Sequence, residues 1–226
     1  MTTATITRAD GVNVTFDLPD PGPPNLDFEQ AADRARLERV AAALTTRGFH
    51  AEVADSTAAA RELVLAGIPE GAEVHIALSE TMRELGVTSE VDESGHYDSV
   101  RMRLRALDRK TQAREMRKAG AAPDYMLGSA HAVTEGGEII VASGSGSQLG
   151  AYAYAAGNLI LVVGHQKIVR DIDEGLRRVR EYSLPREYAR MQSLGHPGSA
   201  LGKTLILHQE RTGRTRVILV PATLGH

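Results

Sequence analysis

A turn rich in glycine and serine is the segment of this 226-residue sequence best suited to bind a ligand. It comprises Ser143, Gly144, Ser145, Gly146, Ser147 and Gln148. A predicted strand, 138–142, precedes it and a helical pattern over 148–156 follows, so the turn joins a strand to a helix. The two glycines allow main-chain N–H groups to approach a ligand, and a helix amino terminus favours negative charge. We therefore expect it to bind an oxyanion, carboxylate or phosphate; the alternative is a tight turn in which Ser147 only caps the helix.

Motifs for nucleotide cofactors and metals are missing from the sequence. The turn lacks the third glycine of a dinucleotide-binding fingerprint, and no Gly-Lys-Ser/Thr follows it as in a P-loop. The eight histidines include no H-x-H, H-x-x-x-H or HExxH spacing. The sequence thus predicts no cofactor and no metal site.

Glu135 and His131 are the candidate catalytic residues. Glu135 follows an apolar run and precedes Gly136 and Gly137, which leave room for a substrate. A carboxylate there would serve as a nucleophile toward an acyl group or as a general base. His131 stands four residues earlier, so in a strand both side chains share one face and form an acid–base pair. The alternatives are an exposed turn glutamate and a hydrogen-bonded core histidine.

His165 and Lys167 follow the most apolar run of the chain, 159–163. We include both among the substrate-binding residues, with Lys167 holding an anionic group. The alternative for Lys167 is a place at the start of a helix.

Composition limits the kinds of partner. The chain has 26 Lys and Arg residues against 29 Asp and Glu residues, which gives a net charge of −3. This balance disfavours nucleic acid as a partner. The segment 101–118 is rich in basic residues, and Arg101, Arg103 and Arg105 share one face if the segment is extended. These side chains could bind an anion or the acidic surface of a neighbouring subunit. The alternative is that they are solvated on the surface.

The absence of cysteine from the sequence excludes thiolate chemistry in this chain. It cannot hold a disulfide, a cysteine-ligated zinc ion or a thiolate-ligated iron–sulfur cluster. The first 20 residues lack the pattern of a signal peptide, and no apolar run reaches the ~20 residues needed to cross a bilayer. We expect a cytoplasmic protein without a membrane partner.

The pattern of apolar residues predicts an α/β fold. Strands are expected at 49–54, 74–78, near Glu90, and at 125–134, 138–142 and 159–163, with helices at 29–46, 57–66, 80–85, 104–119, 148–156 and 168–182. Pro185 is expected to interrupt the last helix. Two further strands, 204–208 and 216–220, are expected to form a hairpin around Thr212 and Gly213. This alternation predicts an open, mainly parallel sheet with helices on both faces and C-terminal antiparallel strands.

Residues 1–27 differ from the rest of the chain. Two alternating segments flank Ala9-Asp10-Gly11 and predict a hairpin, and four prolines between residues 19 and 24 predict an extended linker. We expect residues 1–27 to be an arm that could clasp a second subunit of a homodimer, and residues 28–226 to be a single α/β domain. A loosely held terminus is the alternative.

The segment from Ala119 to Val179 resembles the LUD domain family, which includes lactate-utilisation proteins of the LutC and YkgG type. Three motifs carry the resemblance: Ala-Val-Thr-Glu-Gly-Gly at 132–137, Ala-Ser-Gly-Ser-Gly-Ser-Gln at 142–148, and Val-Val-Gly-His-Gln-Lys-Ile-Val at 162–169. The resemblance implies the fold of ribose-phosphate isomerases, glucosamine-phosphate deaminases and CoA transferases. It also implies a site at the glycine-rich turn. CoA transferases use a glutamate before Asn/Ser-Gly as nucleophile; Glu135 precedes Gly136, but the Asn or Ser is missing.

These observations lead to two functional hypotheses. In the first, a small anionic metabolite (a carboxylate, a phosphorylated compound or a CoA-linked compound) binds at 143–148, and Glu135 supplies transferase or isomerase chemistry. The resemblance implies a role in lactate utilisation. In the second, the chain is a non-catalytic accessory subunit of a lactate-oxidation assembly with iron–sulfur redox partners.

Overall fold

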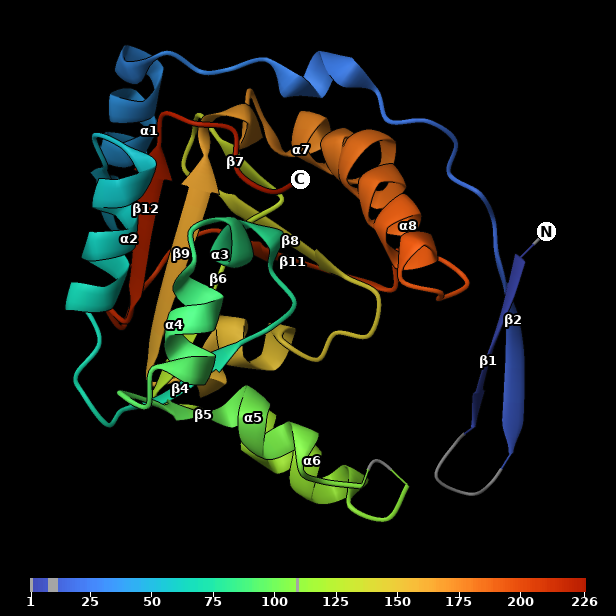
Figure 1. The fold of residues 1–226 in the computed structure, drawn as a ribbon. Coiled ribbons are helices and arrows are strands. Elements are labelled where there is room, and N and C mark those ends of the chain that lie inside the picture. The colour runs from blue at the N-terminus through green and yellow to red at the C-terminus, as the bar shows by residue number, and fades with distance from the viewer. Residues whose placement is uncertain (1, 8–11, 109) are drawn as a thin grey trace.

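The body of the chain is an α/β fold built on a six-stranded parallel sheet (Figure 1). The structure is a computed structural model that describes residues 2–7, 12–108 and 110–226. The strand order is β3-β12-β9-β6-β4-β5, and each neighbouring pair runs parallel. The bounds are β3 (His50–Val53), β12 (Thr215–Val220), β9 (Asn158–Gly164), β6 (Tyr125–Gly128), β4 (Glu73–Ile76) and β5 (Asp98–Ser99). The expected parallel sheet is confirmed.

The central strands are buried on both faces, which explains why they are continuous apolar runs. In β9, Leu159, Leu161 and Val163 belong to one hydrophobic cluster, whereas Ile160 and Val162 belong to another. Helices cover both faces, as expected. The first cluster includes α1 (Arg34–Thr46), and the second includes α2 (Thr57–Ala66), α3 (Glu80–Glu84) and α4 (Val87–Glu93).

A second, four-stranded sheet packs on the α1 face of the main sheet. Its order is β10-β7-β8-β11, where β7 runs parallel to β10 and β8 runs antiparallel to both β7 and β11. Gly175 lies in the helix that covers its outer face, and a Cβ there would lie 2.3 Å from Cδ1 of Ile140. The bounds are β10 (Ile168–Val169), β7 (Ala132–Thr134), β8 (Ile139–Ser143), β11 (Lys203–Leu207) and α7 (Ile172–Arg178).

Two expected elements are divided in the structure. The single strand expected over 125–134 is β6 in the main sheet and β7 in the second sheet, because the chain crosses between the sheets at 129–131. The expected helix 104–119 is α5 (Val100–Arg105) and α6 (Ala113–Ala121), so the basic residues of α5 are helical and not extended. The strand expected near Glu90 is wrong, because that residue lies in α4.

The expected helix 168–182 is also different. Residues 168–169 form β10, and α7 begins only at Ile172, where the side chain of Asp171 caps it. Pro185 does not end the helical segment. A π-helical turn, η4 (Val179–Ser183), leads into α8 (Leu184–Ser193), and Pro185 lies in the first turn of α8, where a missing N–H group is tolerated.

The two C-terminal strands separate into different sheets. β11 runs antiparallel to β8, but β11 and β12 do not form the expected hairpin around Thr212 and Gly213, because β12 lies between β9 and β3. The four residues 217–220 of β12 are fully buried. An apolar strand of this kind needs cover on both faces, which the centre of the main sheet provides and a hairpin does not.

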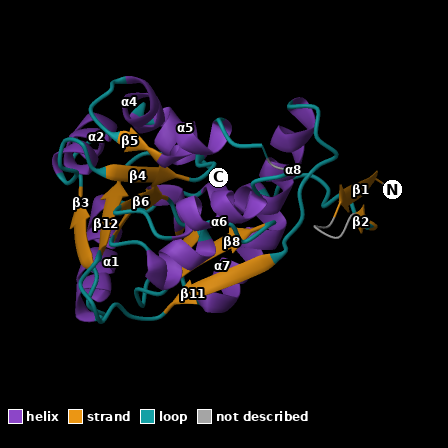
Figure 2. Ribbon diagram, turned by 90° about the horizontal axis from the view of Figure 1, so that it is seen from below, coloured by secondary structure: helices purple, strands orange, loops and turns teal. Residues whose placement is uncertain are grey.

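The N-terminal arm is an antiparallel hairpin, as expected, of β1 (Thr2–Thr7) and β2 (Asn13–Leu18). Its expected turn at Ala9-Asp10-Gly11 lies outside the described residues. The hairpin stands apart from the body in Figures 1 and 2. The linker contacts the body beyond it: the Asn25 N–H group donates to the Glu181 carbonyl oxygen, and Glu29 pairs with Arg186. The division into an arm (1–27) and one domain (28–226) stays a prediction.

Candidate functional site

A cavity of about 1250 Å³ opens where the strands β4, β6 and β8 end. Residues that follow each of these strands line it, together with parts of α5, α6 and α8. Ligands of open α/β folds bind outside the carboxyl ends of the strands, so the cavity lies where this fold class places its sites.

The glycine- and serine-rich turn, residues 143–148, lies in the wall of this cavity. Two of its N–H groups are already used within the turn. Gly146 N donates to Ser143 Oγ at 2.8 Å, and Ser147 N donates to Ser145 Oγ at 3.3 Å. The Ser143 hydroxyl in turn donates to Gln148 Oε1 at 3.0 Å. The serines therefore shape the turn.

Three other N–H groups of the turn remain free. Those of Gly144, Ser145 and Gln148 have no acceptor among the residues that the structure describes. Gly144 and Ser145 are exposed. These three donors are the part of the turn that can bind an anion.

Lys203, on β11, holds the turn from outside. Its Nζ donates to the Ser145 carbonyl oxygen at 3.0 Å. Gly146 has a φ of 82°, and a Cβ there would lie 2.5 Å from Cδ of Lys203. Glycine is therefore required at this position for the conformation and for the close approach.

Lys167 lies in the same cavity wall with only 1% of its surface exposed. Its Nζ donates to Thr81 Oγ1 and to Ser129 Oγ, both at 3.1 Å. No carboxylate pairs with it in the described part of the chain. Burial, and then the nearby Arg178 cation, lower the pKa of Lys167 to about 7. The lysine is thus a buried amine that is close to half-protonated at neutral pH.

His131 also lines the cavity, at the crossing between the two sheets. Its Nδ1 accepts a hydrogen bond from the Ala142 N–H group at 3.1 Å, which places the proton of the neutral ring on Nε2. Burial, and then the Lys167 cation, lower the pKa of His131 to about 3. The ring is neutral at physiological pH and anchors the start of the turn.

Glu135 and His165 are not among the cavity-lining residues. The Glu135 side chain is 49% exposed and pairs with Arg36 at 2.7 Å. The expected shared face with His131 is not formed, because β7 covers only 132–134 and the chain bends on both sides of it. His165 Nε2 lies 3.2 Å from Thr223 Oγ1. The structure therefore brings the turn, Lys167 and His131 together and leaves the other two apart.

Arg178 is a buried cation beside the site that we did not expect from the sequence. Its guanidinium donates to the Gln166 carbonyl oxygen at 3.2 Å, to the His131 carbonyl oxygen, and to Ser183 Oγ at 3.1 Å. It also stacks on the Tyr182 ring at 4.8 Å. Burial lowers its pKa to about 10. Arg178 thus links the segments that carry His131 and Lys167.

The segment 222–226 packs beside Lys167, and its last residue, His226, lines the cavity. Gln166 Nε2 donates to the carbonyl oxygens of Leu224 and Gly225 at 3.0 and 3.1 Å. Gly225 has a φ of 58°, and a Cβ there would lie 2.5 Å from Thr81 Oγ1 and 3.3 Å from Lys167 Nζ. A side chain at this position would therefore displace the lysine or its partner.

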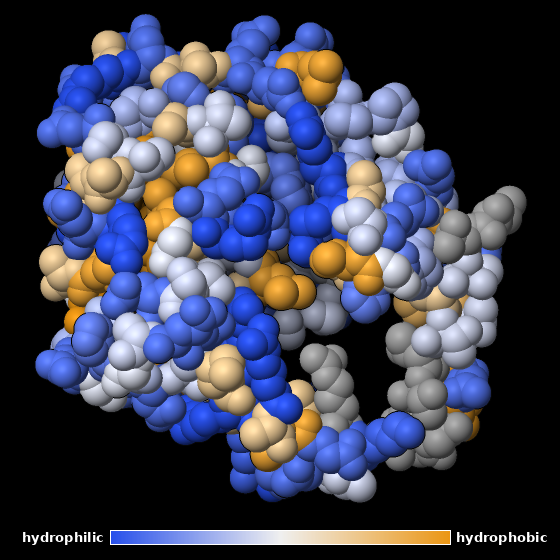
Figure 3. All heavy atoms as spheres, viewed as in Figure 1, coloured by the Kyte–Doolittle hydropathy of each residue, from blue (hydrophilic) through white to orange (hydrophobic). Residues whose placement is uncertain are grey.

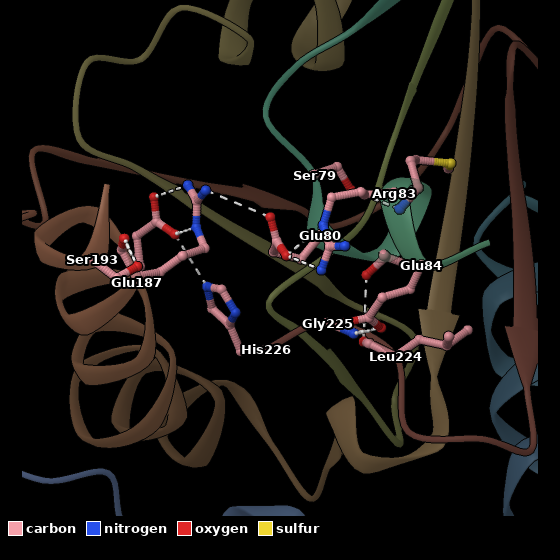
Figure 4. A network of polar contacts seen from close by, with 12 residues as sticks. Ser79, Glu80, Arg83, Glu84, Glu187, Ser193, Leu224, Gly225 and His226 are labelled. Carbon is pink, nitrogen blue, oxygen red and sulfur yellow. Dashed lines mark hydrogen bonds and ion pairs between the residues drawn. The ribbon is translucent and has the colours of Figure 1, made fainter. Parts of the chain in front are cut away.

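A polar network lies at the edge of the cavity (Figure 4). His226 contacts Glu187 at 3.3 Å, and Arg190 pairs with Glu187 at 2.7 Å and with Glu80 at 3.5 Å. Burial raises the pKa of Glu187, but hydrogen bonds from His226 and Arg190 outweigh it and hold the pKa at about 2. The carboxylate is thus ionised and is held by the Arg190 guanidinium and the His226 ring.

The cavity carries an excess of positive charge. Five basic side chains line it, against two acidic ones, Glu80 and Glu187. The basic residues are Arg101, Arg105, Arg117, Lys167 and Arg190. In the space-filling view hydrophilic residues cover most of the visible face (Figure 3). The chain as a whole is slightly acidic, so this local excess favours an anionic ligand.

Within residues 2–7, 12–108 and 110–226, no group of three or more His, Asp or Glu side chains could hold a metal ion. In the same part of the chain, no helix has the length and apolar character to cross a bilayer.

Comparison with known proteins gives a family and a fold. The model of a family described as LUD domain matches residues 37–220. No curated protein matches the chain. The chain is similar to a crystal structure of a DUF162 family protein from Deinococcus radiodurans, with 15% identity and a TM-score of 0.53 over 84% of this chain and 99% of that one. At this identity, the likeness shows the fold alone.

Proposed function

The chain belongs to the LUD domain family, and we propose that its cavity binds a small anionic metabolite between the 143–148 turn and Lys167. The observation that carries the proposal is the buried amine of Lys167, which pairs with no carboxylate among the described residues. A buried cation without a carboxylate is costly unless another negative group approaches it. The free N–H groups of Gly144, Ser145 and Gln148 in the same cavity supply further donors for that group.

The size of the cavity favours a ligand larger than lactate. A typical ligand pocket has a volume of roughly 300–1000 Å³, and this one is about 1250 Å³. A phosphorylated or CoA-linked compound would use more of this space and of the five basic side chains than a three-carbon carboxylate. A lactate-utilisation role would then involve an activated derivative.

The chemistry that this site supports is proton transfer. A group whose pKa lies near the working pH is the most effective general acid or base, and Lys167 meets this condition. Isomerase or transferase chemistry would use it in that role. Glu135 is not part of this proposal, because it lies outside the cavity and pairs with Arg36. Its predicted catalytic role is tested by Glu135→Gln, which should leave ligand binding and turnover unchanged if Lys167 is the base.

Ligand binding is tested by thermal unfolding with inorganic phosphate, lactate, pyruvate, sugar phosphates and acyl-CoAs. A ligand at 100 times its Kd stabilises the native state by about 2.7 kcal/mol. For a chain of this length that corresponds to a Tm increase of about 5–10 °C. We expect an increase with at least one phosphorylated or CoA-linked compound. No increase with any compound would refute the proposal.

The role of Lys167 is tested with Lys167→Met and with the matched control Lys118→Met, which alters an exposed lysine of α6. A charge-assisted hydrogen bond contributes about 1.5–3 kcal/mol, so Lys167→Met should weaken binding at least tenfold. The control should bind as the native protein does. Equal affinities for the two variants would remove Lys167 from the binding site.

A non-catalytic accessory subunit is the second candidate, and the absence of cysteine favours it within a redox pathway. Such a chain would need cysteine-rich partners to hold iron–sulfur clusters. Co-purification with such partners, together with ligand binding but no turnover alone, would support it. Light scattering of the purified chain would test the expected homodimer.

A further inference from the structure

Ser129 is the hydroxyl group placed best for covalent chemistry in the cavity. It directly follows β6, where the chain leaves the main sheet, and its side chain is partly exposed to the cavity. Its Oγ lies 2.6 Å from the Val162 carbonyl oxygen and 3.1 Å from Lys167 Nζ. Lys167 is almost completely buried. The hydroxyl is therefore the more exposed member of the pair, and the amine lies beside it in the same cavity wall.

The surrounding structure holds this pair firmly. The Ser129 N–H group bonds to the Tyr152 phenol oxygen, and that phenol occupies the space that a Cβ on Gly128 would need, 1.6 Å from its position. On the other side, Thr81 Oγ1 accepts from Lys167 Nζ. Neither side chain can move far without displacing packed neighbours.

We propose that Ser129 and Lys167 form a nucleophile–base pair that accepts an acyl group from a thioester or another activated ester. This inference rests on the proposed function, since it takes the acyl compound to bind in the same cavity through an anionic part. The excess of arginine and lysine along the cavity suits the phosphates of a CoA-type thioester.

The reaction balances without a further reagent except water. The Ser129 Oγ attacks the carbonyl carbon of the thioester while neutral Lys167 takes the hydroxyl proton. The carbon–sulfur bond then breaks, and the thiolate takes a proton from Lys167, which leaves an acyl ester on Ser129. Water attacks this ester with Lys167 again as base, releases the carboxylic acid and restores the serine.

The state of Lys167 supports this role. Burial and the Arg178 cation lower the pKa of Lys167 to about 7, so a large fraction of the amine is neutral near physiological pH. A neutral amine can accept a proton, and rotation about the Cβ–Oγ bond would turn the Ser129 proton from the Val162 carbonyl to Lys167 Nζ. At an ordinary lysine pKa almost none of the amine would be available.

Acylation is tested with p-nitrophenyl acetate followed by peptide mass spectrometry. We expect an acetyl group on the peptide that contains Ser129, and its removal by hydroxylamine because it is an ester. Ser129→Ala should slow p-nitrophenolate release at least 100-fold. Ser193→Ala, which alters an exposed serine at the end of α8 outside the cavity, should not. Acetylation of a lysine instead, or native rates in Ser129→Ala, would overturn the proposal.

A second test uses the absence of cysteine from the chain. Ser129→Cys and Ser199→Cys each introduce a single thiol into the cavity wall. A neighbouring lysine cation lowers a thiol pKa, so at pH 7 iodoacetamide should alkylate the thiol at position 129 about tenfold faster. Adding Lys167→Met should remove this difference. Equal alkylation rates in the two single variants would overturn the pairing.

The two proposals fail in different ways. Ser129→Ala should retain the Tm increase produced by the anionic ligand, because the hydroxyl is not needed for charge recognition. Ligand binding without acetylation would refute the nucleophile–base pair alone. Acetylation of Ser129 without any ligand-dependent Tm increase would refute the anion site alone.

Discussion

Lys167 should make the stability of the native protein rise with pH in a range where few other groups titrate. Its pKa is 10.5 in the unfolded chain and about 7 in the native structure. Between these values the unfolded chain binds one more proton than the native protein. The free energy of unfolding therefore increases as the pH rises from 7 toward 10.5.

The size of the effect follows from the two pKa values. The full difference of about 3.5 pH units corresponds to about 5 kcal/mol. Between pH 7 and pH 9 alone, the expected gain in the free energy of unfolding is about 2 kcal/mol. The side chain is 1% exposed, so solvent screening reduces this figure little. The shifted tyrosines and Arg178 titrate at or above pH 10 and fall outside this interval.

The measurement is urea unfolding followed by circular dichroism at pH 7, 8 and 9. The native protein should gain about 2 kcal/mol over this interval. Lys167→Met should show no such gain, because it has no amine to titrate, while Lys118→Met should behave as the native protein does. A full rise in Lys167→Met, or no rise in the native protein, would refute a lowered pKa of Lys167.

Two further predictions concern neighbours of the site. Burial lowers the pKa of His131 from 6.5 to about 3, so the free energy of unfolding should fall as the pH drops below 6.5, by at most about 2 kcal/mol between pH 7 and 5. In urea unfolding, His131→Gln should lose less of this free energy between pH 7 and 5 than the control variant His50→Gln. Equal losses in the two variants would contradict the lowered pKa. Gly128→Ala should lower the free energy of unfolding by about 2 kcal/mol or more, because the new Cβ would overlap the Tyr152 phenol. The control Gly150→Ala, whose Cβ meets open space, should lower it far less in the same assay. Similar losses in the two variants would contradict the packing at Gly128.

Much of the fold could be predicted because its central strands are so apolar. The run 159–163 has no polar residue, and a strand of that kind is typical of a parallel sheet that is covered on both faces. The exchange between sheets at 129–131 could not be predicted, because the apolar pattern continues across it. The position of β12 at the centre of the main sheet depends on pairing with β3, about 160 residues earlier, which no local pattern reveals.

The site could be predicted in part. The 143–148 turn is visible in the sequence because strand, glycines and helix are contiguous. The environment of Lys167 is not, because Thr81, Ser129 and Gly225 come from distant segments and are common residue types. The interpretation of Glu135 rested on two adjacent glycines. Its partner Arg36 lies 99 residues away and holds the carboxylate outside the cavity.

The central place of β12 also constrains how the chain folds during synthesis. Strand β3 ends at Val53, and its neighbour β12 begins at Thr215. At about 5–20 residues per second, a ribosome needs about 10–30 s to make the intervening segment. Throughout that time β3 has no neighbouring strand, and backbone N–H and C=O groups at the sheet edges of the growing chain are unpaired. Nascent chains of this protein should therefore depend on chaperones until β12 has been synthesised.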